Sequence, residues 1–446
     1  DGFVGFYGAN VATLRNERSL NGTYYVVGDG YALAYRNEPT GLPTITYGNG
    51  RTASFTGEIL KTYDASTPYY LAPLPVNVVC TDYIDASSPD SFYQKITIGE
   101  NSYYYNPHFA RTVTVNDSKP AAPDTVAVRT ARQLYDLSRH YGDYAAATAR
   151  STFRQELDID YGSYQWGNYT NYGTISEQSP IGYVGAKGNA PFAAEYDGGY
   201  HSVTGVSFRS ETLQTGMFGY VGSSGSIHDL YLVGSGNAVT YGSRTTSIIT
   251  GSAARLHMGA LAGYNAGTIR NCAASGYTME AYGYLSSTAS IGGLVGTNYG
   301  TIYNSQVDAP AIRTGNTNST AYVGGFAGQN HGAITASYAV GALTIREARN
   351  STVILAGFTA NNESGVIRRC YSAAALTAAG SAEAYGFAPL GGLTDRAYYL
   401  DGGTYSYVGK LYAYNAKEND FAANAAGTAI TGQQLRSLIL SGFGTA

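Results

Sequence analysis

Charged side chains are scarce in this chain, which limits the partners it can attract. They make up 13% of the 446 residues, about half of the roughly 25% typical of soluble domains. Lys and Arg number 27 against 31 Asp and Glu, giving a net charge of -4 with no long run of either sign. The basic surface that nucleic acids or anionic membranes require is therefore missing, and neither is an expected partner.

Cysteine and long apolar segments are also sparse. Cys80, Cys272 and Cys370 are too few and too scattered for a disulfide framework or a cysteine-based zinc site. No window approaches 18 apolar residues, so no transmembrane segment is expected. Because the chain begins with Asp1 rather than Met, we expect a signal peptide to have been removed.

Tyrosine and glycine, in contrast, are abundant, with 43 and 57 residues. Tyrosine can fill a β-stack while its hydroxyl stays in water. The clusters Tyr69 and Tyr70, Tyr103 to Tyr105, and Tyr398 and Tyr399 could form platforms for sugars or could serve packing. Packing is favoured because tyrosine is spread over the whole chain.

Residues 1–117 have the pattern of a β-rich module resembling a sandwich or small barrel. Short apolar runs alternate with turn signals such as GDG at Gly28 and GNG at Gly48. The expected strands are Thr23–Val27, Tyr31–Tyr35, Thr44–Tyr47, Phe92–Ile98 and Arg111–Val115. A polar segment with two prolines follows, and it predicts a linker over residues 118–125.

Two helices are expected outside the repeats. Thr130 and Gln133 form a capping-box pattern ahead of apolar residues at helical spacing, which predicts a helix over about 131–149. Its apolar positions are Leu134, Leu137, Tyr141 and Tyr144. A second helix is expected between Thr431 and Gly442, within a C-terminal cap or tail over residues 401–446.

The strongest signal is an internal repeat. Similar segments begin at Gly259, Gly292, Gly324 and Ala356, at intervals of 33, 32 and 32 residues. An earlier copy begins at Gly216, and a degenerate one lies near Phe387. Self-similarity at this period indicates a solenoid, because one repeat cannot bury its apolar face without a neighbour.

The repeat is β rather than helical, because short apolar runs are interrupted by glycines that would break a helix. We expect two or three strands in each coil, and equivalent residues stacked from coil to coil. Isoleucines would form an apolar ladder and asparagines a polar one, while the glycines would allow left-handed backbone at the corners. These structural positions are Gly263, Asn265, Gly267, Ile269, Gly296, Asn298, Gly300, Ile302, Gly328, Asn330, Gly332, Ile334 and Ile367.

The segment GGLVGTNYGTI, starting at Gly292, resembles the core pattern of the GLUG-motif repeat proteins. That family occurs in bacterial surface and secreted proteins, including adhesins and relatives of IgA-cleaving metalloproteases. Phe192 to Phe208 is similar to the segment that precedes such repeats, and Phe153 to Tyr161 to its first strand. The resemblance covers residues 126–400 and implies a right-handed β-helix-like solenoid outside the cell. It carries no catalytic residues.

A metalloprotease would need an HExxH motif, which the chain lacks. The histidines, His108, His140, His201, His228, His257 and His331, are isolated from one another in sequence. His331 occupies a repeat corner where other copies carry Ala266 and Tyr299, so we expect this position to face solvent. No GxSxG or phosphate-binding loop is present, and no metal or cofactor is expected.

Polysaccharide lyases and glycosidases remain the alternative class, because β-helices can host them and two carboxylates could serve. Asp158 and Asp160 alternate along a predicted strand, as do Glu195 and Asp197, so each pair faces one side. A structural role is favoured for both pairs. It is also favoured for Cys272 and Cys370, which share one repeat position with Ser305 and Ser337 and are expected to be small buried residues.

The sequence thus predicts an all-β chain, a sandwich-like module followed by a parallel solenoid of about 32-residue repeats with a capping helix over residues 126–400. The expected function is that of a non-enzymatic extracellular structural or adhesive surface protein. Its partners would be further copies in a filament, or glycans or proteins of a host or cell surface.

Overall fold

The computed structural model describes residues 121–164, 176–185, 188–242, 255–281, 288–313, 320–347, 352–379, 382–389 and 391–400, with Phe92 and short strands elsewhere. The chain divides into two compact units. Unit 1 comprises Asp1–Phe153 and Ser163–Ile175, and unit 2 comprises Arg154–Gly162 and Ser176–Ala446. The boundary falls within strand β12 (Thr152–Gln155). No helix among the described residues is long and apolar enough to cross a membrane.

Unit 1 begins with short strands that pair antiparallel. Each of the five expected strands overlaps an observed one, which confirms the β pattern of this part. The strands are β1 (Leu14–Ser19), β2 (Gly22–Val27), β3 (Ala32–Tyr35), β4 (Thr44–Thr46), β5 (Thr52–Ser54), β6 (Leu60–Thr62), β7 (Tyr69–Pro73), β8 (Gln94–Ile98), β9 (Asn101–Asn106) and β10 (Arg111–Val113). A further strand, β11 (Thr125–Val128), precedes the helix.

The first expected helix is present as α2 (Ala131–Tyr144), and residues 145–150 form turns instead of extending it. The Thr130 hydroxyl accepts a hydrogen bond from Gln133 N at 3.1 Å. The Gln133 side chain reaches back to Arg129 N rather than to Thr130 N, at 2.7 Å, so the capping box is shifted by one residue. All four predicted apolar positions are buried. The helix expected after Thr431 lies outside the described residues.

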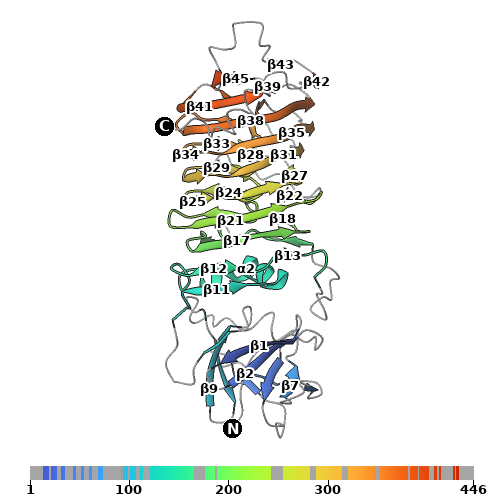
Figure 1. The fold of residues 1–446 in the computed structure, drawn as a ribbon, viewed down its shortest axis with the longest axis vertical. Coiled ribbons are helices and arrows are strands. Elements are labelled where there is room, and N and C mark those ends of the chain that lie inside the picture. Colours follow the sequence, from blue (N-terminus) through green and yellow to red (C-terminus); the bar gives the residue numbers. More distant parts are fainter. Residues whose placement is uncertain are drawn as a thin grey trace. The chain divides into compact units, whose positions relative to one another are not determined.

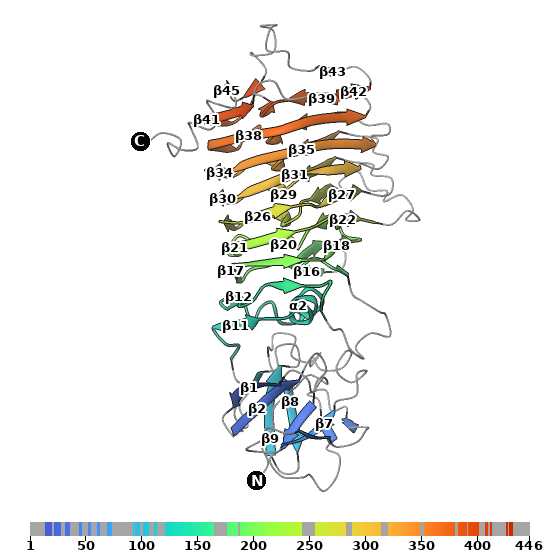
Figure 2. The ribbon, with the colours of Figure 1, turned by 45° about the vertical axis from the view of Figure 1, so that its right-hand side comes forward.

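Unit 2 is a parallel β-solenoid, in which strands of successive coils pair side by side (Figures 1 and 2). Its longest sheet runs, in order, through β13 (Ile159–Asp160), β14 (Glu177–Gln178), β17 (Glu195–Thr204), β18 (Ser207–Ser210), β21 (Ser226–Val233), β22 (Ala238–Tyr241), β25 (Thr268–Arg270), β26 (Ala273–Ser275), β27 (Thr278–Ala281), β30 (Thr301–Tyr303), β31 (Gln306–Arg313), β34 (Ala333–Thr335), β35 (Tyr338–Glu347), β38 (Val366–Ala379), β41 (Leu393–Leu400), β42 (Ser406–Val408) and β45 (Thr428–Ile430).

Two further parallel sheets complete the coils. One contains β19 (Gln214–Thr215), β23 (Leu256–Met258), β28 (Ala289–Gly292), β32 (Ala321–Gly324), β36 (Val353–Ala356), β39 (Ala382–Tyr385) and β43 (Leu411–Tyr412). The other contains β20 (Phe218–Val221), β24 (Ala262–Asn265), β29 (Val295–Asn298), β33 (Ala327–Asn330) and β37 (Thr359–Asn361). The coil that begins with β28 holds β28, β29, β30 and β31, which is more than the two or three strands expected.

Small antiparallel pairs also occur in unit 2. They are β15 (Tyr183–Gly185) with β16 (Gly188–Ala190), and β40 (Ala388–Pro389) with β44 (Ala425–Ala426).

The predicted isoleucine ladder is confirmed. Ile269, Ile302, Ile334 and Ile367 are register partners in successive coils, and all are fully buried. The ladder also continues one coil earlier, where Ile227 pairs with Ile269. Ile269, Ile302 and Ile334 therefore each pack between two isoleucines, and such repetition lets the interior reach the close packing typical of protein cores.

The predicted asparagine ladder is confirmed as well. Asn265 Nδ2 donates to Asn298 Oδ1 at 2.8 Å, and Asn298 Nδ2 donates to Asn330 Oδ1 at 2.8 Å. The chain of bonds extends to Asn362, which accepts from Asn330 at 2.7 Å. These amides have no exposed surface from Asn265 to Asn330, so the ladder satisfies polar groups that burial would otherwise penalise.

The role predicted for the repeat glycines is wrong. None of the six predicted glycines lies among the residues with positive φ. A Cβ on Gly300 would instead lie closer than 3.0 Å to the carbonyl oxygen of Gly267, and one on Gly332 would lie as close to that of Gly300. Glycine is required there because the backbones of adjacent coils approach too closely for a side chain.

The left-handed corner of each coil is occupied by other residue types. Asn271, Asn304, Ala336 and Arg369 have φ of 53°, 47°, 49° and 54° at equivalent places. Asparagine tolerates this conformation better than most residues. Each corner residue is followed by a buried cysteine or serine, which helps to close the turn.

Another buried row of equivalent residues becomes aromatic in the later coils. Leu261, Leu294, Phe326, Phe358 and Phe387 are all fully buried. The rings of Phe326 and Phe358 stack at 4.8 Å between centroids, and those of Phe358 and Phe387 stack at 4.7 Å. The degenerate repeat expected near Phe387 is therefore part of the solenoid.

We predict that Ile302→Ala costs about 2 to 5 kcal/mol of unfolding free energy, because it removes contacts from the coils on both sides. Tyr299 is the matched control. Its side chain is 49% exposed, as expected, but its ring stacks between Tyr264 and His331. Tyr299→Ala should therefore cost about 1 kcal/mol, more than the 0.5 kcal/mol of an ordinary surface site. Denaturant unfolding that ranks Tyr299→Ala above Ile302→Ala would contradict the register.

A second prediction compares one substitution in two hydrogen-bonded asparagine ladders. Asn298→Asp removes a buried donor and adds a buried charge, so it should cost about 3 kcal/mol. Asn304 Nδ2 donates to Asn271 Oδ1 at 2.8 Å on the exposed side of the same coil. Water can replace that bond, so Asn304→Asp should change stability by less than about 0.5 kcal/mol. Equal losses of stability in thermal unfolding would contradict the assignment of Asn298 to a buried ladder and Asn304 to an exposed one.

Candidate functional site

The first predicted carboxylate pair does not form a site. Asp158 Oδ1 accepts from Ser202 N at 2.7 Å and from the Ser202 hydroxyl at 3.1 Å. The bond from Ser202 N is the main reason that the pKa of Asp158 lies below its usual value. Asp160 Oδ1 accepts from Gly162 N at 2.8 Å. Both carboxylates hold neighbouring backbone in place, which is the structural role favoured from the sequence.

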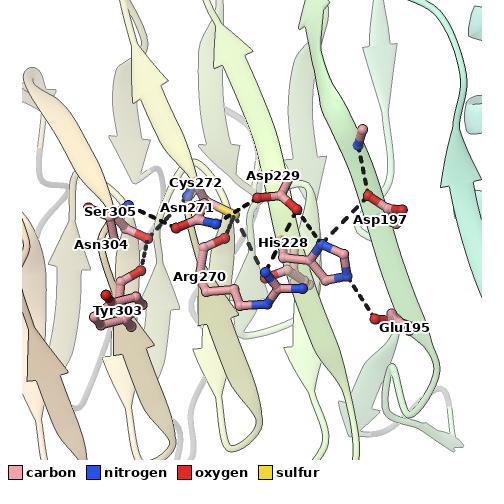
Figure 3. A network of polar contacts seen from close by, with 12 residues as sticks. Glu195, Asp197, His228, Asp229, Arg270, Asn271, Cys272, Tyr303, Asn304 and Ser305 are labelled. Carbon is pink, nitrogen blue, oxygen red and sulfur yellow. Dashed lines mark hydrogen bonds and ion pairs between the residues drawn. The ribbon is translucent and has the colours of Figure 1, made fainter.

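The second pair belongs to a larger polar group. Glu195 and Asp197 on β17 lie beside His228 and Asp229 on β21, and Figure 3 shows them converging. His228 Nε2 lies 2.7 Å from Glu195 Oε1, and its Nδ1 lies 2.8 Å from Asp229 Oδ2 and 3.6 Å from Asp197 Oδ1. With two flanking arginines, we call this set the histidine cluster: Arg154, Glu195, Asp197, His228, Asp229 and Arg270.

The solenoid register places these side chains on one outer row. Asp197, His228 and Arg270 are register partners in three successive coils, next to the inward row of Tyr196, Ile227 and Ile269. Because side chains alternate along a strand, the residue after each buried one points outward. His228 is nevertheless only 7% exposed, because the neighbouring carboxylates cover it.

Local backbone features aim the two aspartates at the imidazole. Gly199 has φ of 59°, and its N–H donates to Asp197 Oδ1 at 2.9 Å. A Cβ on Gly198 would collide with the backbone of Asp229. Asp229 has φ of 55°, and its Oδ1 accepts from Asn271 Nδ2 at 2.8 Å. The sequence Asp197–Gly198–Gly199 therefore lets β17 bend closely around the next coil.

Hydrogen bonds and two arginines surround the carboxylates of the cluster. Burial raises the pKa of Asp229, but hydrogen bonds from Asn271 and His228 and the charge of Arg270 outweigh it, so the pKa lies below its usual value. Arg154 Nε lies 3.3 Å from Asp197 Oδ2. The charge of Asp229 and its hydrogen bond raise the pKa of Tyr200, whose side chain is 63% exposed.

The cluster contains donors that can bind a metal ion. Asp197, His228 and Asp229 each offer one ligand atom, and these atoms lie within 4.8 Å of one another. Glu195 and Asp197 were candidates from their sequence pattern, whereas His228 is isolated in sequence and neither Asp229 nor the arginines were predicted. The sequence does contain a signal for the place of His228. When the copy that begins at Gly216 is aligned with the next copy so that Ile227 matches Ile269, His228 matches Arg270, and the two residues are register partners in the structure.

The other histidine and cysteine predictions concern packing. Tyr220, Tyr264, Tyr299 and His331 stack across four coils at 4.5, 5.4 and 4.5 Å between ring centroids. His331 Nδ1 also pairs with the Ser364 hydroxyl at 3.0 Å. The ring faces are turned toward one another, so this row stabilises the coils. The tyrosine clusters, for which packing was favoured over sugar platforms, have side chains outside the described residues.

Cys272 and Cys370 are buried and unpaired with each other, as expected. The Cys272 thiol contacts the Arg270 carbonyl oxygen at 3.2 Å, and the Cys370 thiol contacts that of Arg368 at 3.2 Å. The hydroxyls of Ser305 and Ser337 make the equivalent bonds in the coils between them. The column is therefore a turn-closing feature.

Comparisons with known proteins identify no family for this chain. No family model and no curated protein matches it. A crystal structure of a Bacteroides ovatus protein, named there as a candidate immunoglobulin A1 protease, has a TM-score of 0.45 at 19% identity, covering 73% of this chain and 88% of that one. A structure named IgA1 Protease has a TM-score of 0.31 at 11% identity, and this chain spans 32% of its length. These scores are too low to support any inference about activity.

We predict that Cys272 and Cys370 resist alkylation in the native protein. Burial raises the pKa of each thiol to about 12, so almost no thiolate exists at pH 8. Iodoacetamide should modify both only after unfolding, as measured by peptide mass spectrometry, which also separates them from Cys80. Rapid native modification of either residue would contradict its placement inside the coils.

Proposed function

We propose that this chain is a non-enzymatic extracellular structural or adhesive surface protein, in which the solenoid acts as a stiff support. One observation carries the proposal: the residues that define the repeat make contacts from coil to coil. Ile302 and Asn298 are fully buried between equivalents in the neighbouring coils. A motif used in this way builds length and rigidity, whereas a catalytic motif would direct unique side chains toward a substrate.

The outer surface of unit 2 supports the same proposal. The row from Tyr220 to His331 continues the coil-to-coil stacking on the outside. Aromatic pairs contribute about 0.5 to 1.5 kcal/mol each beyond their buried area. Repeats stabilised mainly by nearest neighbours can be extended without redesigning a core, which suits a surface spacer.

We further propose that these repeats are of the GLUG type, on the basis of the motif GGLVGTNYGTI at Gly292. The partners would be glycans or proteins of a host or cell surface, or further copies of this chain in a filament. Self-association would proceed by strand addition, because unpaired strand edges at the ends of a solenoid can pair with strands from another molecule.

A polysaccharide-degrading enzyme is the alternative, and the closeness of Asp197 and Asp229 favours it. Glycoside hydrolysis by two carboxyl groups requires one of them to hold a proton while the other is ionised. The lowered pKa of Asp229 makes it a poor proton donor. Asp197 accepts a hydrogen bond from Gly199 N and pairs with Arg154, so its carboxylate is already engaged by two other groups.

The test combines binding and turnover on the full chain. Glycan and host-protein arrays should show binding, and sedimentation should report any self-association. Panels of plant and mucin polysaccharides should release no new reducing ends. Release by the wild type and by Asp158→Asn, but not by Asp197→Asn, would overturn the proposal and place catalysis in the histidine cluster.

A further inference from the structure

The two ring nitrogens of His228 face three carboxylates. Nε2 lies 2.7 Å from Glu195, while Nδ1 lies 2.8 Å from Asp229 and 3.6 Å from Asp197. A neutral imidazole has one N–H and one lone pair. In either neutral tautomer the lone pair of one ring nitrogen faces a carboxylate, so a cation is needed at that nitrogen. When Nε2–H donates to Glu195, the cation lies between Nδ1 and the two aspartates. That cation is either a proton or a metal ion.

We infer that a divalent transition metal ion of the zinc type binds between His228 Nδ1, Asp229 Oδ2 and Asp197 Oδ1. Zinc bonds to nitrogen and carboxylate oxygen are about 2.0 to 2.2 Å long, so tetrahedral donors lie about 3.4 Å apart. The distances of 2.8 and 3.6 Å from Nδ1 to the two carboxylates bracket that value. All three donor atoms lie within 4.8 Å of one another.

The surroundings of the three donors match those of metal sites. A histidine ligand usually donates its other N–H to a carboxylate, which fixes the ring and its tautomer. Glu195 is in that position for His228. Asn271 holds the second oxygen of Asp229, and Gly199 N orients Asp197. Each proposed ligand therefore has a supporting hydrogen bond from another residue.

The donor set also selects the class of metal. Calcium prefers six to eight oxygen ligands, whereas imidazole suits zinc and its transition-metal neighbours. Three protein ligands leave a fourth position for water or a group from a bound molecule. Arg270, the nearest cation to Asp229, is 3.8 Å away and its side chain is 42% exposed, so it can turn toward solvent when the ion binds.

Such an ion would join the first coils of unit 2. Asp197 belongs to β17, and His228 and Asp229 belong to β21, so binding would add a link between two coils already joined by backbone pairing and the His228–Glu195 contact. This inference does not depend on the proposed function, because zinc could stabilise a structural protein or serve an enzyme equally well.

The test is zinc titration of the full chain after removal of metal by a chelator, with a chromophoric competitor to report binding. One equivalent should bind and raise the unfolding temperature. Asp197→Asn should weaken binding more than about 100-fold, and Glu195→Gln about 10- to 100-fold, because the first removes a ligand and the second its support. Asp158→Asn, which changes another carboxylate beside a histidine, should bind like the wild type.

Both test substitutions preserve side-chain shape, and unfolding of the chelated proteins will verify that each variant is folded. Calcium should not compete. The inference is overturned if wild type and Asp197→Asn bind zinc equally. It is also overturned if no zinc binds to the wild type. Nitrogen NMR that shows both His228 ring nitrogens protonated at pH 7 would then identify the cation as a proton.

Discussion

The distance between coils is the constraint on which unit 2 depends. Parallel strands that share backbone hydrogen bonds lie about 4.8 Å apart, so each residue has its equivalent in the next coil as its nearest neighbour. At Gly300 and Gly332 even a Cβ would collide with the coil before. In the ladders the side chain packs against a copy of itself, which flat rings, isoleucines and asparagine amides do well.

The same constraint explains why the solenoid could be predicted from the sequence. Stacking requires the same residue type at a fixed interval, so the isoleucine and asparagine ladders are visible as a repeat of 32 or 33 residues. Asn362 was missed because the last repeat has one additional residue between it and Ile367, compared with Asn330 and Ile334. The glycine role was misassigned because sequence alone does not distinguish a left-handed turn from a close backbone approach.

The histidine cluster could not be predicted in the same way, since it lies where the repetition is weakest. Glu195 and Asp197 belong to the segment before the first recognisable copy, so no repeat alignment relates them to His228. Their convergence depends on the bend at Gly198 and Gly199 and on the left-handed Asp229. A repeated motif identifies the residues that stabilise the solenoid. Side chains that occur in one coil only can be grouped into a site only when the three-dimensional positions of the coils are known.

The central claim is that adjacent coils stabilise each other through contacts between residues at equivalent positions. A double-mutant cycle tests this claim directly. Phe326, Phe358 and Phe387 stack in sequence, and Leu294 occupies the same row, so Phe→Leu should be tolerated. Coupling between Phe326→Leu and Phe358→Leu should be about 1 kcal/mol. Coupling between Phe326→Leu and Phe387→Leu, two coils apart, should be within about 0.3 kcal/mol of zero. Equal coupling in both pairs, or none in the adjacent pair, would contradict the account.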